Sequence, residues 1–165
     1  MPPSAASRRG WIVGSLAMLA AGCGDSPARG PAPASAKAPP IESITLERYG
    51  HDPDDPRYEV TIRRDGGVTY VGTRNVPRIG TFRAEVGVEG FRRFGDLVAR
   101  IDFFGFRDDY PLVPDADYAR TTVTAGGRTK AVADGWGSPS PVDLWGLQMA
   151  IDGFVAGQRD WREVK

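Results

Sequence analysis

The chain has 165 residues, of which 41% are apolar, and its 21 basic side chains balance 21 acidic ones. This length and composition favour one folded domain with a sizeable core. A formal net charge of +0 argues against a surface that binds nucleic acid or another polyanion. The single cysteine, Cys23, has no partner with which to form an intramolecular disulfide.

The first 22 residues have the layout of a bacterial export signal. Arg8 and Arg9 form a positively charged start, and an apolar run from Trp11 to Ala21 ends in small residues. This run is too short to span a membrane comfortably. We therefore expect residues 1–22 to be a cleaved signal peptide. A partial match around the two arginines leaves both the general secretory and the twin-arginine route open.

The segment Leu19-Ala-Ala-Gly-Cys23 resembles the lipobox of bacterial lipoproteins. In that family the cysteine thiol takes a diacylglycerol and the new N-terminus is acylated, and two or more acyl chains give stable anchoring. The resemblance implies a covalent lipid on Cys23 and a location on a membrane of the bacterial cell envelope. We expect no other cofactor. The alternative is an ordinary secreted protein in which this cysteine is incidental.

Residues 23–40 join the cysteine to the first segment with apolar periodicity. They are rich in Pro, Ala, Ser and Gly and contain almost nothing to bury. Such a segment cannot offset the entropy cost of ordering, so we expect a disordered tether. The sequence then predicts a single folded domain over residues 41–165.

The domain is predicted to begin with strands. Residues 44–49 alternate apolar and polar side chains, and residues 58–72 hold two more alternating runs on either side of Asp65-Gly66-Gly67. Glycine can take the positive φ angles of a tight turn, so residues 58–72 are predicted to form a β-hairpin. Residues 81–86 are predicted to form a further strand.

Helical periodicity follows in the next segment. Its apolar residues recur every three or four positions, with charged residues between them, at Phe91, Phe94, Leu97 or Val98, and Ile101. Three aromatic residues come directly after this helix, Phe103, Phe104 and Phe106. We expect them to plug the core beneath the helix end instead of forming a ligand cage.

A second hairpin, across Gly126-Gly127, and a second helix complete the domain. Ser140 is expected to cap this helix, with Pro141 as its first residue and Asp143 completing a capping box. The apolar residues at helical spacing are Leu144, Leu147, Ile151 and Phe154 or Val155. Because the strands cluster in hairpins, we predict the α+β class: an antiparallel sheet built from β-hairpins, with two amphipathic helices packed on one face.

The order of several motifs resembles that of a bacterial family. The motifs are Tyr-x-Val-Thr-Ile-x-x-Asp-Gly-x-Val-x-Tyr at 58–70, Asp102-Phe-Phe, Asp108-Asp-Tyr, Gly126-Gly-Arg-Thr-Lys and Leu144-Trp. The family consists of small, often lipid-anchored domains that are catalogued only as a domain of unknown function. The resemblance covers residues 44–161 and implies no activity.

Members of that family commonly carry two cysteines a few residues apart, with a proline after the second, in the loop ahead of the hairpin. In this chain the loop is His51-Asp-Pro-Asp-Asp-Pro56, which has no thiol. A disulfide or a thiolate role for this loop is therefore excluded here.

The same loop is the nearest approach to a metal site, through His51, Asp52, Asp54 and Asp55. Carboxylates can hold Ca²⁺, and an imidazole with carboxylates can hold Zn²⁺. Ca²⁺ loops usually need a glycine at the sharp turn and Zn²⁺ sites more than one His or Cys, so a solvated acidic loop is the competing interpretation. The acids of a second loop, residues 108–117, could complete a site if the two loops meet.

Catalytic and binding residues are harder to place. The only histidine lies in no nucleophile motif, and both Gly-Gly pairs are hairpin turns instead of phosphate loops, which favours a domain without catalysis. Trp136 stands between two glycines in a loop and is a candidate partner contact, unless it folds back over the end of the sheet. Trp145 and Trp161 are expected at the edge of the core.

We therefore predict a lipid-anchored cell-envelope protein that binds an unknown envelope protein or ligand, and not nucleic acid. The alternative is a metal-binding or metal-dependent hydrolytic domain that uses His51 and the acidic loops. A third possibility is a structural spacer.

Overall fold

The computed structural model of the chain describes residues 39–111 and 113–165. The predicted signal peptide, Cys23 and all but the end of the predicted tether lie outside the described residues. The described residues form an open antiparallel sheet of seven strands with two helices, which confirms the predicted α+β class.

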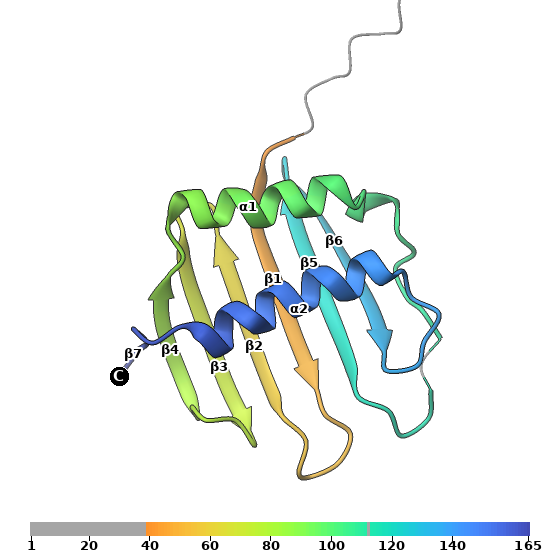
Figure 1. Ribbon diagram of the computed structural model, residues 1–165, viewed down its shortest axis with the longest axis horizontal. Helices are drawn as coiled ribbons and strands as arrows, with labels where there is room; N and C mark the ends of the chain where they lie inside the picture. The colour runs from red at the N-terminus through yellow and green to blue at the C-terminus, as the bar shows by residue number, and fades with distance from the viewer. Residues whose placement is uncertain (1–38, 112) are drawn as a thin grey trace, which may run out of the picture. The chain divides into compact units, whose positions relative to one another are not determined.

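The strands run in the order β6-β5-β1-β2-β3-β4-β7 across the sheet, and each is antiparallel to its neighbours (Figure 1). Their bounds are β1 Ile41–Tyr49, β2 Arg57–Arg63, β3 Gly67–Arg74, β4 Gly80–Glu85, β5 Tyr118–Ala125, β6 Arg128–Gly135 and β7 Arg162–Glu163. The helices are α1, Gly87–Arg100, and α2, Val142–Gly157, and a 3₁₀ turn, η1, spans Phe103–Gly105.

The hairpin turn between β2 and β3 shows why glycine is needed there. Gly66 has a φ angle of +84°, in the left-handed region that favours glycine. A Cβ atom on Gly66 would lie 2.4 Å from the carbonyl carbon of Gly87, at the start of α1. The turn is closed by the Asp65 carboxylate, whose Oδ1 accepts a hydrogen bond from the Gly67 N–H at 2.8 Å. The turn therefore sets both the hairpin register and the approach of α1.

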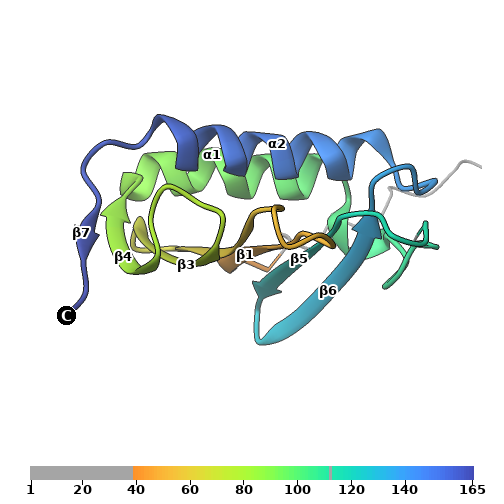
Figure 2. The ribbon, with the colours of Figure 1, turned by 90° about the horizontal axis from the view of Figure 1, so that it is seen from below.

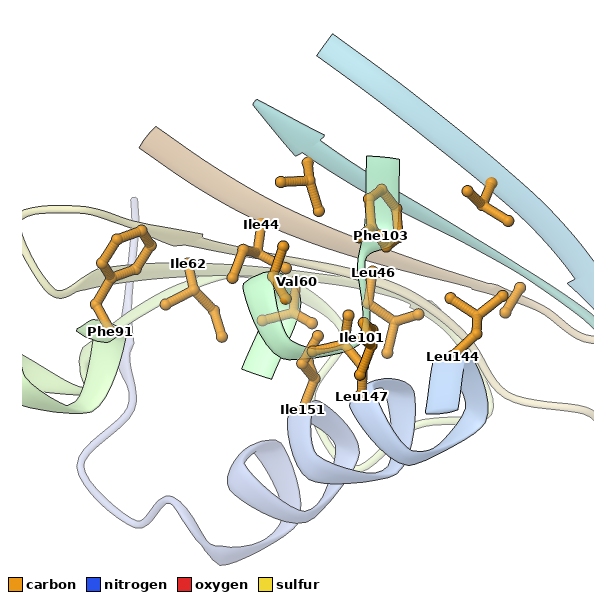
Figure 3. Close-up of a cluster of buried hydrophobic side chains, with 14 of the residues drawn as sticks. Ile44, Leu46, Val60, Ile62, Phe91, Ile101, Phe103, Leu144, Leu147 and Ile151 are labelled. Carbon is orange, nitrogen blue, oxygen red and sulfur yellow. The ribbon is translucent and has the colours of Figure 1, made fainter. Parts of the chain in front are cut away.

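Both helices lie on one face of the sheet and enclose the core with it (Figures 2 and 3). The sheet contributes fully buried residues such as Ile44, Leu46, Val60 and Ile62, and the helices contribute Phe91, Val98, Leu144, Leu147 and Ile151. Phe103 of η1 is also buried in this cluster, with Phe104 and Phe106 packed against it. The predicted aromatic plug is thus part of the core.

The opposite face of the sheet is polar. Thr45, Thr61, Thr69 and Thr122 lie directly across from one another on four adjacent strands. The hydroxyl oxygens of Thr45 and Thr61 are 2.9 Å apart, within hydrogen-bonding distance. In the described part of the chain, neither helix covers this face (Figure 2).

Short segments cover both edges of the sheet. At β6, the Tyr110 N–H donates to the Ala133 carbonyl, and the Ala133 N–H donates to the Asp108 carbonyl, both at 2.9 Å. At β4, the two-residue strand β7 supplies the pairing. Strand β7 was not predicted, because two residues cannot display a period-2 pattern. Covered edges reduce pairing with other chains.

The start of α2 differs from the prediction. Pro141, and not Ser140, occupies the N-cap, and no side chain caps the helix. The Ser140 hydroxyl instead donates a hydrogen bond to Oδ2 of Asp134 at 3.0 Å. The predicted capping box is therefore wrong: the Ser140 side chain is held at Asp134, and its oxygen accepts no hydrogen bond from the first turn of α2.

The two helices differ in the distribution of their apolar side chains. Helix α1 has the predicted arrangement, with Phe91 and Val98 buried and charged residues outside. Helix α2 buries the predicted stripe but also exposes Val142, Trp145 and Met149. Neither helix of the described residues is long and apolar enough to cross a membrane.

Candidate ligand-binding cleft

A cleft of about 640 Å³ lies between α2 and one end of the sheet. Its walls come from α2, from the last residues of β1 and β6, from the first residues of β2 and β5, and from the loop that joins β6 to α2. We call it the α2 cleft. The segments from β1, β2 and β5 are separate in the sequence from the continuous region of β6, loop and α2, and the fold brings them together.

Exposed apolar side chains gather around the α2 cleft. Trp136 of the β6–α2 loop is 76% exposed, and Val142, Trp145 and Met149 of α2 are also exposed. All four line the cleft, and Val113 lies beside it, near Gly137. The three α2 residues are spaced three and four positions apart, so they form one stripe on the helix. We call these four lining residues the apolar rim; clusters of this kind mark interaction sites on soluble proteins.

A first polar group ties α2 to the sheet. Asp152 of α2 accepts a hydrogen bond from the Tyr58 hydroxyl at 2.5 Å through Oδ1 and pairs with the Arg48 guanidinium at 2.6 Å through Oδ2. Burial, followed by the hydrogen bond to Asp152, raises the pKa of Tyr58 well above its ordinary value. Arg48 neutralises Asp152, so this group holds the helix in place without leaving an unpaired charge.

A second polar group surrounds Asp134, and its partners among the described residues include no basic side chain that neutralises the carboxylate. Asp134 is only 5% exposed, on the side of β6 that faces the helices. Its Oδ1 accepts from Nε2 of the buried Gln148 at 2.6 Å, and its Oδ2 accepts from Ser140. Gln148 Nε2 also lies 3.3 Å from Oγ1 of Thr121. All these partners are neutral, and no cationic side chain of residues 39–111 and 113–165 pairs with Asp134.

The histidine loop lies next to the cleft. His51 Nε2 is 3.3 Å from Oδ1 of Asp115, and the His51 N–H donates to Oδ1 of Asp117, a residue that lines the cleft. The two acidic loops therefore meet. Asp55 accepts a hydrogen bond from the Asp52 N–H within the first loop. No group of three His, Cys, Asp or Glu side chains in the described residues is placed to hold a metal ion.

Sequence reasoning found one residue of the cleft and missed most of the others. Trp136 was singled out and lies on the rim, whereas Trp145, expected at the core edge, is half-exposed beside it. Gln148 falls on the predicted buried stripe of α2, and Asp134 falls two positions after the buried Val132. The sequence signal that could have found the cleft was a polar residue, Asp134 or Gln148, at a position whose periodicity predicts burial.

The comparison with protein families identifies a family for this chain but no activity. Residues 43–155 match a family described as Domain of unknown function (DUF6438), and this match spans the walls and the rim of the α2 cleft. Cys23 lies outside the matched residues. No curated protein matches the chain. Because the match covers more than half of its residues, the chain belongs to this family of unknown function.

Proposed function

We propose that this protein is a lipid-anchored domain of the bacterial cell envelope that binds another envelope component in the α2 cleft and performs no chemistry. The observation that carries the proposal is the apolar rim, with Trp136 and Trp145 exposed at the mouth of a cleft. Tryptophan side chains are the commonest binding hot spots in interfaces.

The apolar rim adds little to the stability of the fold. Helix α2 already buries Leu144, Leu147 and Ile151 on its other side. Burying one large apolar side chain contributes roughly 1.5–3 kcal/mol, and the rim side chains leave much of that contribution unused in the isolated chain. A partner that covers the rim would gain this free energy on binding, which supports a binding role.

The contacts inside the cleft also favour binding over catalysis. Ser140 is the serine of the cleft that meets a carboxylate, through its hydrogen bond to Asp134. Activation of a serine commonly uses a histidine or another strong base beside it. The only histidine of the chain, His51, instead pairs with the exposed Asp115.

A capture experiment on solubilised envelopes tests the binding role. The full-length chain carries an affinity tag in three forms: wild type, Trp136→Ala, and Val88→Ala as a control. Val88 is also apolar and exposed but lies on α1, outside the cleft. We expect one specific partner to be recovered with wild type and control, and at least about ten-fold less with Trp136→Ala. No recovery at all, or equal recovery with Trp136→Ala, would contradict the proposal.

The anchor rests on the sequence Leu19-Ala-Ala-Gly-Cys23. Metabolic labelling with a palmitate analogue should mark the wild type and fail on Cys23→Ala. An unlabelled wild type that is released into the medium would contradict the predicted location.

A metal-dependent role, in binding or hydrolysis, is the second candidate, because the His51 and Asp117 loops do meet. Metal sites in proteins take three or more protein ligands in most cases, and the contact between His51 and Asp115 provides two. Calorimetry with Ca²⁺ and with Zn²⁺ decides the matter. The absence of both binding heat and a rise in the melting temperature at millimolar metal would remove this candidate.

A further inference from the structure

We infer that the α2 cleft takes an organic cation: a ligand with an alkylammonium group that pairs with Asp134 and places its carbon substituents against the tryptophans of the apolar rim. This inference rests on the proposed function and specifies its ligand. It follows from the charges that line the cleft, from the burial of one carboxylate, and from the exposed rings beside it.

The charges that line the cleft favour a cation. Three acidic residues, Asp117, Asp134 and Asp152, and one basic residue, Arg48, line it, which leaves two net negative charges. The basic residue is already engaged, because the Arg48 guanidinium pairs with Asp152 at 2.6 Å. An anionic ligand would therefore meet two carboxylates without a free basic partner in the lining.

Asp134 is the most specific of these groups. A buried carboxylate that has only neutral partners is costly, and an opposite charge beside it removes much of that cost. Each of its oxygens accepts one hydrogen bond, from Gln148 and from Ser140. An ionised carboxylate has about four acceptor positions, so about two accept no hydrogen bond from the described residues. An ammonium group supplies both the charge and, when it is primary, the missing donors.

The rim supplies the second half of the recognition. Trp136 is 76% exposed and Trp145 is half-exposed, so the surfaces of both side chains are available to a ligand. Among aromatic side chains, tryptophan attracts an ammonium ion most strongly over its ring face, and aromatic side chains are a recurrent way to bind alkylated ammonium groups. A metal ion makes no use of the rings, and the described residues offer it no group of three ligands.

A neutral ligand is the closest competitor, since a sugar or an alcohol also packs on tryptophan. It would leave Asp134 without an opposite charge. Cationic probes and their neutral isosteres therefore separate the two possibilities. The probes are choline with 3,3-dimethylbutan-1-ol, and n-butylammonium with butan-1-ol.

The experiment titrates the purified full chain with each probe and follows tryptophan fluorescence and heat. We expect saturable binding of at least one ammonium probe and at least about ten-fold weaker binding of its neutral isostere. The comparison of choline with n-butylammonium separates a quaternary headgroup from a primary amine such as a lysine side chain or a polyamine.

Two variants locate the site. Asp134→Asn keeps the size of the side chain and removes its charge, and we expect ammonium binding to weaken at least about ten-fold. Asp54→Asn removes the same charge from an exposed loop residue outside the cleft, and we expect no change. Thermal melting checks that each variant folds. If Asp134→Asn does not fold, Trp136→Leu, at an exposed position, should lose the preference for the cation.

The outcomes separate this inference from the proposed function. Equal binding of a cation and its isostere, abolished by Trp136→Ala, would overturn the cationic ligand and leave a binding cleft. Failure of all four probes to bind, while an envelope partner is still captured through Trp136, would also overturn the cationic ligand and leave a binding cleft. Failure of both the probes and the capture would overturn both proposals.

Discussion

Helices α1 and α2 lie side by side on the same sheet, yet their outer surfaces differ (Figure 2). On α1, Arg92 pairs with Glu89 at 2.6 Å and with Asp96, so its outer side is charged and solvated. On α2 the outer side presents Trp145 and Met149. Both helices supply the core, but α1 exposes one large apolar side chain, Val88, whereas α2 exposes three, Val142, Trp145 and Met149. The contrast separates residues that build the fold from residues that are free for binding.

Helix α2 departs from a simple amphipathic helix on both of its sides. It is apolar outside, at the rim, and it carries the polar Gln148 inside, where a core residue is expected. Gln148 holds Asp134, and both residues line the same cleft as the exposed Trp145. The two departures therefore point to one site, which is the physical basis of the proposed binding role.

The largest effect is expected on the buried side of α2. Leu147 is fully buried, so Leu147→Ala should lower the free energy of unfolding by about 2–5 kcal/mol, measured by urea denaturation. Met149→Ala, two positions further on the exposed stripe, should change it by less than about 0.5 kcal/mol. Equal losses for the two variants would show that the outer stripe is part of the core and would remove the contrast.

A smaller effect is expected for the buried polar group. Gln148→Leu removes the donor to Oδ1 of Asp134 without much change in volume. Because this leaves a buried acceptor unpaired, the free energy of unfolding should fall by about 1–3 kcal/mol. Gln158→Leu is the matched control, since its amide donates at the surface to the Glu85 carbonyl at 3.1 Å. An unchanged or higher stability of Gln148→Leu would show that this network does not hold Asp134 in place.

Two tyrosines that line the cleft, Tyr49 and Tyr58, predict a loss of stability at alkaline pH. The hydrogen bond to Glu47 raises the pKa of Tyr49 to about 12, and burial together with Asp152 raises the pKa of Tyr58. A pKa above the unfolded value of about 10 means that the folded state keeps a proton that the unfolded state loses. This contribution is complete below pH 10 and disappears as the pH rises through the folded pKa.

The measurement is the free energy of unfolding between pH 9 and about pH 12, in wild type and in Tyr58→Phe. The decline above pH 10 should be shallower in Tyr58→Phe, because this variant has no phenol to titrate between α2 and β2. Parallel curves would show that Tyr58 does not link the helix to the sheet through a protonated hydroxyl.

The smallest effect is expected on α1. Arg92 and its partners Glu89 and Asp96 are exposed, so salt and water screen their attraction. Arg92→Ala should leave the urea midpoint within experimental error at physiological ionic strength. A loss as large as that of Gln148→Leu would show that the outer side of α1 contributes to the fold after all.

Local patterns were enough to predict most of the fold. The alternation at Val60 and Ile62 and the turn at Gly66 identified the first hairpin, and the spacing of Phe91 and Val98 identified α1. These signals depend on neighbours within one or two turns of chain, which a sequence displays directly. The face on which the helices pack followed from the same apolar positions.

The cleft could not be predicted in the same way, because its parts meet only in the folded chain. Arg48 and Tyr58 belong to separate strands, and Asp152 reaches them from a helix about a hundred residues later. The wrong N-cap has a related origin: the Ser140 side chain bonds to Asp134 at the end of β6, and Pro141 takes the cap position. A rule that considers one helix at a time does not include such contacts between elements.

The most direct measurement is partner capture by Trp145→Ala, with the free energy of unfolding determined on the same preparation. Trp145 lies on the apolar rim, half-exposed, with Leu144 and Leu147 buried on the other side of α2. We predict at least about ten-fold less captured partner than with wild type, and a change in stability far below that of Leu147→Ala. Wild-type capture, or a loss of stability as large as that of Leu147→Ala, would contradict a binding role for the outer side of α2.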